Sequence, residues 1–264
     1  MEFLRNNVLG LGQKTIELIR YTGSVTVLVG HTFLAMLQGP FRIRHVLRHV
    51  QKIGTESLPI VSLISLFTGM VLALQSAYQM QKISAEMYIA SLVALSMTRE
   101  LGPVLTALIV AGRCGASITA ELGTMKVTEQ IDALETMGTN PVNYLVIPRF
   151  WALLISVPLL TIYSDFIGMV GGYLVGHFKL GISDHVYHRM TFEPLKHRDI
   201  YAGLAKSIAF AMVICIIACY EGLNAEEGAE GVGKATTASV VRSFILIIAV
   251  DCLLTAMFYF IGKV

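Results

Sequence analysis

Five long apolar runs constrain the fold of this chain more than any other feature. Each run holds roughly the 20 residues that an α-helix needs to cross the hydrocarbon core of a bilayer. The runs are Leu58–Ala77, Met87–Gly112, Phe150–Gly176, Ile200–Tyr220 and Ser243–Ile261. A charged fraction of only 14% and a mean hydropathy of +0.67 exclude an ordinary soluble domain. The sequence therefore predicts an all-α polytopic membrane protein with five transmembrane helices.

Residues 1–52 are predicted to form a separate region before the five-helix domain at 53–264. In its first part, positions at the spacing of one helix face predict an amphipathic helix in the membrane interface. These positions are Leu4, Val8, Leu11, Thr15 and Leu18. The apolar stretch Ser24–Leu37 is too short to span the bilayer, and Arg20 and Arg42 flank it. Because basic residues favour the cytoplasmic side, we expect this stretch to lie shallow or to be re-entrant.

The distribution of basic residues predicts the direction in which the chain crosses the membrane. With the N-terminus in the cytoplasm, the cytoplasmic segments carry more lysine and arginine than the external ones, as the positive-inside rule requires. The basic segment from Lys179 to Arg198 is the exception, because this arrangement places it outside. Five spans then put the C-terminus on the opposite side from the N-terminus.

Two adjacent charges, Arg99 and Glu100, fall near the middle of the second run. They precede Gly102 and Pro103, where a helix can kink and free backbone groups. A charge at this depth costs about 2.5–3.5 kcal/mol on insertion scales, so such residues face a bundle interior or a wet cavity. Two interpretations stay open, a structural ion pair with other helices and a role in the path of a substrate.

The later runs contain few charges. Lys206 and Asp251 have opposite charges on consecutive predicted helices, and we expect them to form an intramembrane ion pair because an unpaired charge there is costly. Asp165, in the third run, has no evident partner in the sequence. All four cysteines lie in or beside apolar runs, which favours reduced, buried thiols over disulfides.

The segment at about 119–138 is predicted to form a short amphipathic helix on the cytoplasmic side. Val127, Ile131 and Leu134 share one face of it, acidic residues occupy the others, and Gly138 ends the pattern. A helix this short is marginal alone in water. We therefore expect it to dock either on a partner or on its own bundle.

Two motifs suggest ligand chemistry but are incomplete. Gly228–Lys234 has the glycine and lysine spacing of a phosphate-binding loop, yet the next residue is Ala235, which has no hydroxyl for a magnesium ion. Two histidine pairs have the spacing of metal ligands but lack a third ligand and an adjacent general base. These pairs are His45 with His49 and His185 with His188. Neither nucleotide binding nor a metal site is predicted, and the composition gives nucleic acid no role.

Three segments resemble one known family. The longest, from Glu121 to Phe150, begins ELGTMKVTEQIDALETMGTNP; the others are GMVLALQ at Gly69–Gln75 and a segment at Ala94–Ala116 that contains ALSMTRELGPV and AGRCGA. Together they resemble the MlaE/YrbE family of permeases associated with MCE proteins, and the resemblance runs from about Gly54 to the C-terminus. The chain departs from the family pattern at Cys114, where a small residue is usual, and at Asp165, where an apolar residue is expected.

The resemblance implies a function and an assembly. It implies the homodimeric permease subunit of an ABC transporter in the bacterial inner membrane, with its N-terminus cytoplasmic and its C-terminus periplasmic. Its partners would be a cytoplasmic ABC ATPase, a periplasmic ring of MCE-domain proteins and a small cytoplasmic accessory subunit. The system would move phospholipids between the inner membrane and the MCE protein, in maintenance of outer-membrane lipid asymmetry. This chain would be no enzyme and hold no cofactor, since ATP and magnesium would bind the separate ATPase.

The resemblance also assigns two sets of site residues. Lipid-pocket candidates on the first two spans are Leu72, Gln75, Gln79, Arg99, Glu100 and Leu101. The predicted cytoplasmic helix becomes a coupling helix that contacts the ATPase, with contact candidates Glu129, Gln130, Ile131, Leu134 and Glu135. A pocket with an apolar wall and a few convergent polar groups suits a phospholipid, which joins an anionic headgroup to two apolar tails.

Two other classes of function compete with a permease. A membrane-embedded lipid-modifying enzyme could use Glu100, His185 or His188, but no nucleophile stands with a base at a sensible spacing. An ion-coupled secondary transporter could use the intramembrane charges as a relay, but five spans without an internal repeat fit that class poorly.

Overall fold

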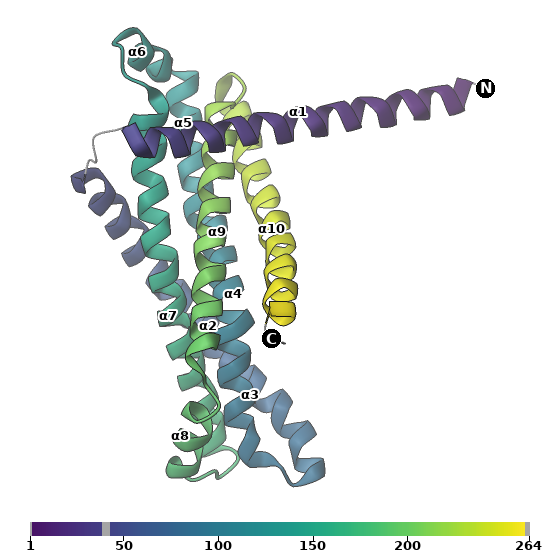
Figure 1. Cartoon of the computed structure of the whole chain (residues 1–264), viewed down its shortest axis with the longest axis vertical. Helices are drawn as coiled ribbons and strands as arrows, with labels where there is room; N and C mark the ends of the chain where they lie inside the picture. Colours follow the sequence, from purple (N-terminus) through teal and green to yellow (C-terminus); the bar gives the residue numbers. More distant parts are fainter. Residues whose placement is uncertain (1, 39–42, 262–264) are drawn as a thin grey trace.

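The computed structural model describes residues 2–38 and 43–261, and the described part is all-α, as predicted. Five stretches are long and apolar enough to cross a membrane, and they correspond one by one to the five predicted spans. Within the described residues they are α2 (Ile43–Met80), the stretch Glu86–Val127 with α3 (Ile89–Ser96), α4 and α5, the stretch Val142–Phe178 with α7 (Ile147–Phe178), α9 (His197–Leu223) and α10 (Gly228–Ile261). The shorter helices α6 (Gln130–Thr136) and α8 (Asp184–Phe192) lie at opposite ends of the bundle (Figure 1).

The first helix, α1 (Glu2–Gln38), lies across one end of the bundle, and its N-terminal part projects beyond it (Figure 1). The two parts expected from the sequence, an interfacial helix and a separate short segment, form one uninterrupted helix. Gly12, Gly23 and Gly30 only weaken a helix, and no proline stops it between Glu2 and Gln38. The depth of α1 in a membrane stays a prediction. Arg42 and the side chains of Leu4, Val8, Leu11 and Leu18 lie outside the described residues.

Helices α2 and α7 pack with their backbones in direct contact. A Cβ atom added at Gly69 of α2 would overlap the carbonyl oxygen of Gly168, and one added at Gly171 of α7 would overlap that of Leu66. Only glycine allows this approach, which small residues commonly provide between membrane helices. Ser65 and Ser164 share a hydrogen bond of 2.7 Å across the same contact.

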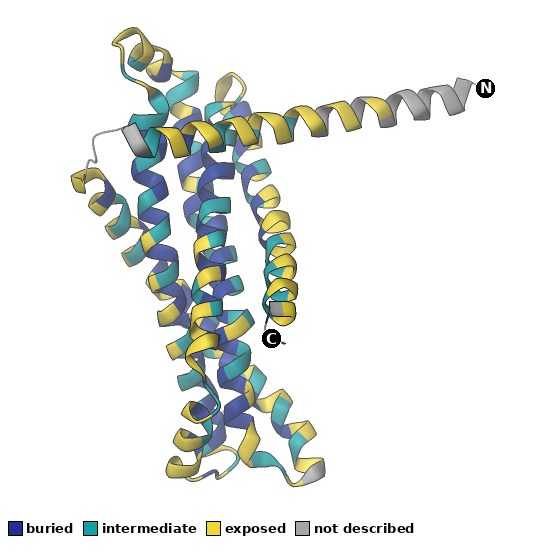
Figure 2. Ribbon diagram, in the orientation of Figure 1, coloured by how far each residue is buried: buried dark blue, intermediate teal, exposed yellow. Residues whose placement is uncertain are grey.

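Buried side chains lie along the inner faces of α2 to α9, whereas α10 is largely exposed in the single chain (Figure 2). Small residues on one face of α10, such as Ser239 and Ser243, are buried against the bundle. Its other face presents large apolar side chains to the outside, among them Ile245, Ile248 and Leu253. In a bilayer this face would contact lipid or another protein.

The second span contains a π-helical turn just before Gly102 and Pro103, where the sequence suggested that a helix can kink. This turn comprises Met97–Leu101 (η3) and leads without interruption into α4 (Gly102–Val110). A wider turn removes the clash between a proline ring and the carbonyl four residues earlier, here that of Arg99. The carbonyl oxygen of Arg99 instead accepts a hydrogen bond of 3.1 Å from the Lys206 ammonium.

The predicted cytoplasmic helix is shorter than expected. Residues up to Val127 continue the second span as α5 (Ala116–Val127), and Glu129, with a left-handed φ of 57°, starts the separate helix α6. Val127 therefore does not share a helix with Ile131. At the other end Gly138 takes a φ of 72°, and its N–H donates to the Glu135 carbonyl at 2.9 Å. The helix ends there because this backbone conformation favours glycine.

Candidate functional site

Lys206 is the centre of a charge cluster inside the bundle. Its side chain is almost fully buried in α9, and its ammonium lies 2.9 Å from Asp251 Oδ1 of α10, the predicted ion-pair partner. The ammonium also donates to Glu100 of η3 and, at 2.7 Å, to Thr255 Oγ1 of α10. Together with the Arg99 carbonyl, these partners compensate a charge that would otherwise be costly in the membrane interior.

Arg99 forms a second pair next to this cluster. Its Nε donates to Asp199 Oδ1 at 2.8 Å, and its side chain is 51% exposed whereas that of Asp199 is 8% exposed. Asp199 also accepts a hydrogen bond from the Lys196 backbone N–H at 3.0 Å and so caps the start of α9. Asp199 is not among the site residues predicted from the sequence. An acidic residue in the first turn of a predicted helix is the signal that could have found it.

The other lipid-pocket candidates, three on α2 and Leu101 on η3, differ in exposure. Leu72 and Leu101 are half-buried and pack against the same apolar cluster, between α2, α3 and α7. Gln75 and Gln79 are exposed on the outer surface of α2 in the single chain. The structure thus groups Arg99 and Glu100 with Lys206 and Asp251 and leaves the two glutamines open to the surroundings.

Asp165 of α7 is half-buried, and one of its carboxyl oxygens is buried. This oxygen, Oδ1, has no hydrogen-bond partner among the described residues. The carboxyl group lies against Gly102, where an added Cβ would overlap Asp165 Oδ1. The close contact exists because Gly102 has no side chain.

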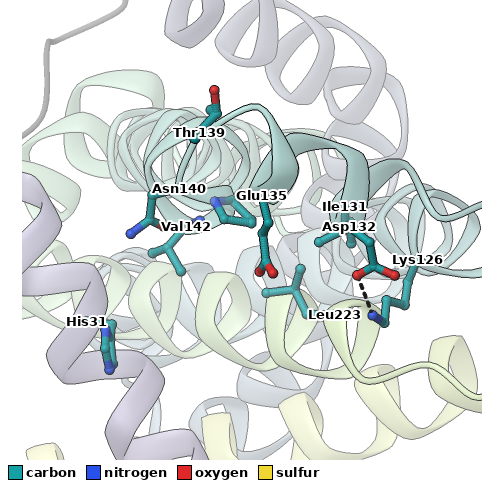
Figure 3. Close-up of a pocket in the computed structure, with 11 residues that line it drawn as sticks. His31, Lys126, Ile131, Asp132, Glu135, Thr139, Asn140, Val142 and Leu223 are labelled. Carbon is teal, nitrogen blue, oxygen red and sulfur yellow. Dashed lines mark hydrogen bonds and ion pairs between the residues drawn. The ribbon is translucent and has the colours of Figure 1, made fainter.

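A hollow of about 600 Å³ lies at the other end of the bundle, beside α6 (Figure 3). It is bounded by α1, by α6 with the loop after it, and by the end of α9. Its lining residues are His31, Lys126, Ile131, Asp132, Glu135, Gly138, Thr139, Asn140, Pro141, Val142 and Leu223. Lys126 donates to Asp132 at 3.0 Å, while Glu135 points into the hollow toward Leu223 (Figure 3).

The predicted ATPase contacts on α6 differ in exposure. Glu129, Gln130 and Glu135 are exposed, and Leu134 is half-buried. Ile131 is only 5% exposed and packs in the core of its own bundle. Ile131, on the apolar face of α6, thus packs on its own bundle, while Glu129, Gln130 and Glu135 are exposed at the surface.

A hydrogen-bonded contact group of Tyr21, Glu221 and Arg242 attaches helix α1 at the same end. The Tyr21 hydroxyl donates to Glu221 Oε1 at 2.9 Å, and Arg242 pairs with the same carboxylate. The Arg242 guanidinium also lies 4.3 Å from the centre of the Tyr21 ring. Burial and then the Glu221 carboxylate raise the pKa of Tyr21 above its ordinary value.

Comparison with known proteins adds independent information. Residues 46–257 match a family model described as "Permease MlaE". A probable ABC transporter permease protein of Rickettsia felis is 44% identical over 256 residues, 97% of this chain and 99% of that protein. An intermembrane phospholipid transport system permease protein MlaE of Haemophilus influenzae is 37% identical over 261 residues, again 97% and 99%. Protein TRIGALACTOSYLDIACYLGLYCEROL 1, chloroplastic, of Arabidopsis thaliana is 35% identical over 89% of this chain and 67% of its own length.

Proposed function

Because this chain belongs to the MlaE permease family and is the membrane-spanning permease subunit of an ABC transporter, we propose that its cargo is a phospholipid. Membership in this family does not favour a lipid-modifying enzyme or an ion-coupled secondary transporter. With five spanning helices and this family, the chain is a multi-pass protein of the inner membrane. The name of the Haemophilus relative, which specifies phospholipid transport, supports the choice of cargo.

The observation that carries the proposal is the half-exposed guanidinium of Arg99 within the second span. Its partner Asp199 is buried and engages one side of the group, so the exposed side remains available to a ligand. A guanidinium gives charge-assisted hydrogen bonds to phosphate oxygens. Leu72 and Leu101, which pack close to this region, provide the apolar surface that acyl chains require.

The proposed pocket comprises the six residues assigned from the resemblance. Glu100 would fix Lys206, Arg99 would meet the phosphate, and the exposed Gln75 and Gln79 would contact the headgroup of a lipid held at a dimer interface. The exposed apolar faces of α2 and α10 support this arrangement, because a second copy would cover part of them.

The proposed assembly follows the family. Two copies of this chain would bind two cytoplasmic ATPase subunits, which hold ATP and magnesium, and a periplasmic ring of MCE-domain proteins, with a small cytoplasmic accessory subunit. We propose a cytoplasmic N-terminus and a periplasmic C-terminus, as the distribution of basic residues favours. The process served would be the maintenance of outer-membrane lipid asymmetry.

Lipid crosslinking from the assembled complex tests the pocket. A photoreactive amino acid at position 72, 75, 99 or 100 is expected to capture phospholipid that mass spectrometry of the purified complex identifies. Matched controls are Leu159 of α7 and Ile248 of α10, whose side chains are exposed on the outer surface of the bundle. Capture at the two control positions but at none of the four pocket positions would mean that the pocket lies elsewhere. A complex that retains an ATPase but no phospholipid at any position would overturn the proposed cargo.

A further inference from the structure

The hollow beside α6 continues along α1. A second hollow of about 620 Å³ is lined by one side of α1 from Arg20 to His31 and by the end of α9. The two hollows share His31, Val142 and Leu223 in their linings. They therefore form one groove, with α1 as a wall along its length and α6 at one end. We call this the α1–α6 groove.

The α6 end of the groove has an acidic group without a partner. Lys126, the lysine in its lining, is engaged by Asp132 at 3.0 Å. Glu135 points into the same hollow, and it has no ion-pair partner among the side chains that the structure describes (Figure 3). A carboxylate in this position favours a basic side chain from outside and disfavours an anionic lipid headgroup.

The wall formed by α1 has a defined position. The Tyr21, Glu221 and Arg242 contact group ties α1 to the last turn of α9 and to the first half of α10, within one helical turn of Ser24, which lines the groove. A partner that enters the groove would therefore meet α1 at a fixed distance from α6, and could move α9 and α10 through the same contact group.

We propose that the ATPase subunit docks into the α1–α6 groove, so that α1 and α6 both contact it, and that an arginine or lysine of the ATPase pairs with Glu135. This inference rests on the proposed function, in which α6 is the coupling helix. It adds a second contacting helix and the chemistry of the partner's anchoring residue. The burial of Ile131 in its own bundle agrees with it, since the apolar face of α6 is already occupied.

Photo-crosslinking in the assembled complex tests the groove. A photoreactive amino acid at His31 or Ser24 is expected to capture the ATPase subunit, as is one at Glu135. Controls are Ile16 and Ile19, which are exposed on α1 at 60% and 67% but do not line the groove. Capture from position 135 without capture from 24 or 31 overturns the groove and leaves coupling through α6 intact. No capture from any of the three positions, in a complex that retains its ATPase, overturns both.

Removal of the Glu135 charge tests its proposed pairing with a basic residue of the ATPase. Glu135→Gln is expected to weaken retention of the ATPase roughly tenfold, about the loss of one charge-assisted hydrogen bond, with a smaller effect at high salt. Glu227→Gln is the matched control, because it removes the same charge from an exposed loop at the same end of the bundle, outside the groove. Equal retention in the two variants, with the permease inserted in the membrane, would contradict the pairing with Glu135.

Discussion

At the scale of single residues, Lys206 connects three helices through one ammonium group. Its partners come from η3, where Glu100 and the Arg99 carbonyl lie, and from α10, where Asp251 and Thr255 lie. A buried ammonium has three N–H donors, so a ligand that bound directly to Lys206 would have to displace one of these partners. The cluster therefore acts first as a connection between helices.

Loss of Lys206 is predicted to be worse than loss of the whole cluster. Lys206→Met leaves Glu100 and Asp251 facing each other without a cation, which we expect to cost about 3 kcal/mol or more. Adding Glu100→Gln and Asp251→Asn should recover much of that stability, because the remaining groups are neutral. Thermal unfolding of the purified complex in detergent measures both effects. A triple variant no more stable than Lys206→Met would contradict this account.

A simple charge swap between Lys206 and Asp251 is not expected to restore stability. The pair predicted from the sequence is in fact part of a larger cluster, because Glu100 contacts the same ammonium. A carboxylate at position 206 would face Glu100 and repel it. The sequence could identify the opposite charges at 206 and 251, but not which residue of the second span would meet them.

Gly102 and Asp165 are predicted to be coupled. Gly102→Ala places a Cβ on the Asp165 carboxyl oxygen and should destabilise the protein by roughly 1–3 kcal/mol. Asp165→Ala removes that oxygen, which has no hydrogen-bond partner in the described part of the chain, and should be better tolerated. The double variant should regain most of what Gly102→Ala loses, as unfolding temperatures would measure. Simple addition of the two single effects would argue against the contact.

At the scale of helices, the five spans could be predicted because length and apolar composition alone decide whether a helix can cross a bilayer. Local backbone features were harder to predict from the sequence than the spans. The second span combines Pro103 with a π-helical turn, and the carbonyl of Arg99 that the proline frees accepts a hydrogen bond from Lys206 on a helix distant in sequence. Periodicity placed Ile131 and Leu134 on one face of α6, but it could not tell which surface would cover them.

The attachment of α1 is predicted to depend on the Tyr21 hydroxyl. Tyr21→Phe removes its hydrogen bond to Glu221 and should cost about 1 kcal/mol, seen as faster amide hydrogen exchange in α1. Tyr201→Phe, at an exposed site on α9, is the control and should leave exchange in α1 unchanged. Because folding raises the Tyr21 pKa, the stability that Tyr21 contributes is fully present below its ordinary pKa of about 10. This stability decreases as the pH rises above that value, toward the raised pKa of the folded state. Unchanged exchange in Tyr21→Phe would contradict this role.

At the scale of the whole molecule, the orientation in the membrane is predicted to follow its basic residues. In a Cys252→Ser background, which removes the exposed native thiol, Lys179→Cys should react with a membrane-impermeant maleimide in spheroplasts. Glu227→Cys should react only after lysis, since it lies in the loop at the opposite end of the bundle from residue 179. The reverse labelling pattern would show that the basic segment from Lys179 to Arg198 is cytoplasmic and that the proposed orientation is wrong.

The packing of α2 against α7 has a mechanical consequence for any transport cycle. Backbone atoms of the two helices touch at Gly69 and Gly171, so neither helix can rotate or slide without a collision between main-chain atoms. We expect the pair to move as one rigid body. Helix α10 is attached by small side chains, by the buried Ile247 and by charges at Arg242 and Asp251, without such backbone contacts, and we expect it to have more freedom to change position. Relative motion between the α2–α7 body and α10 is therefore the least costly way for this fold to open and close around its cargo.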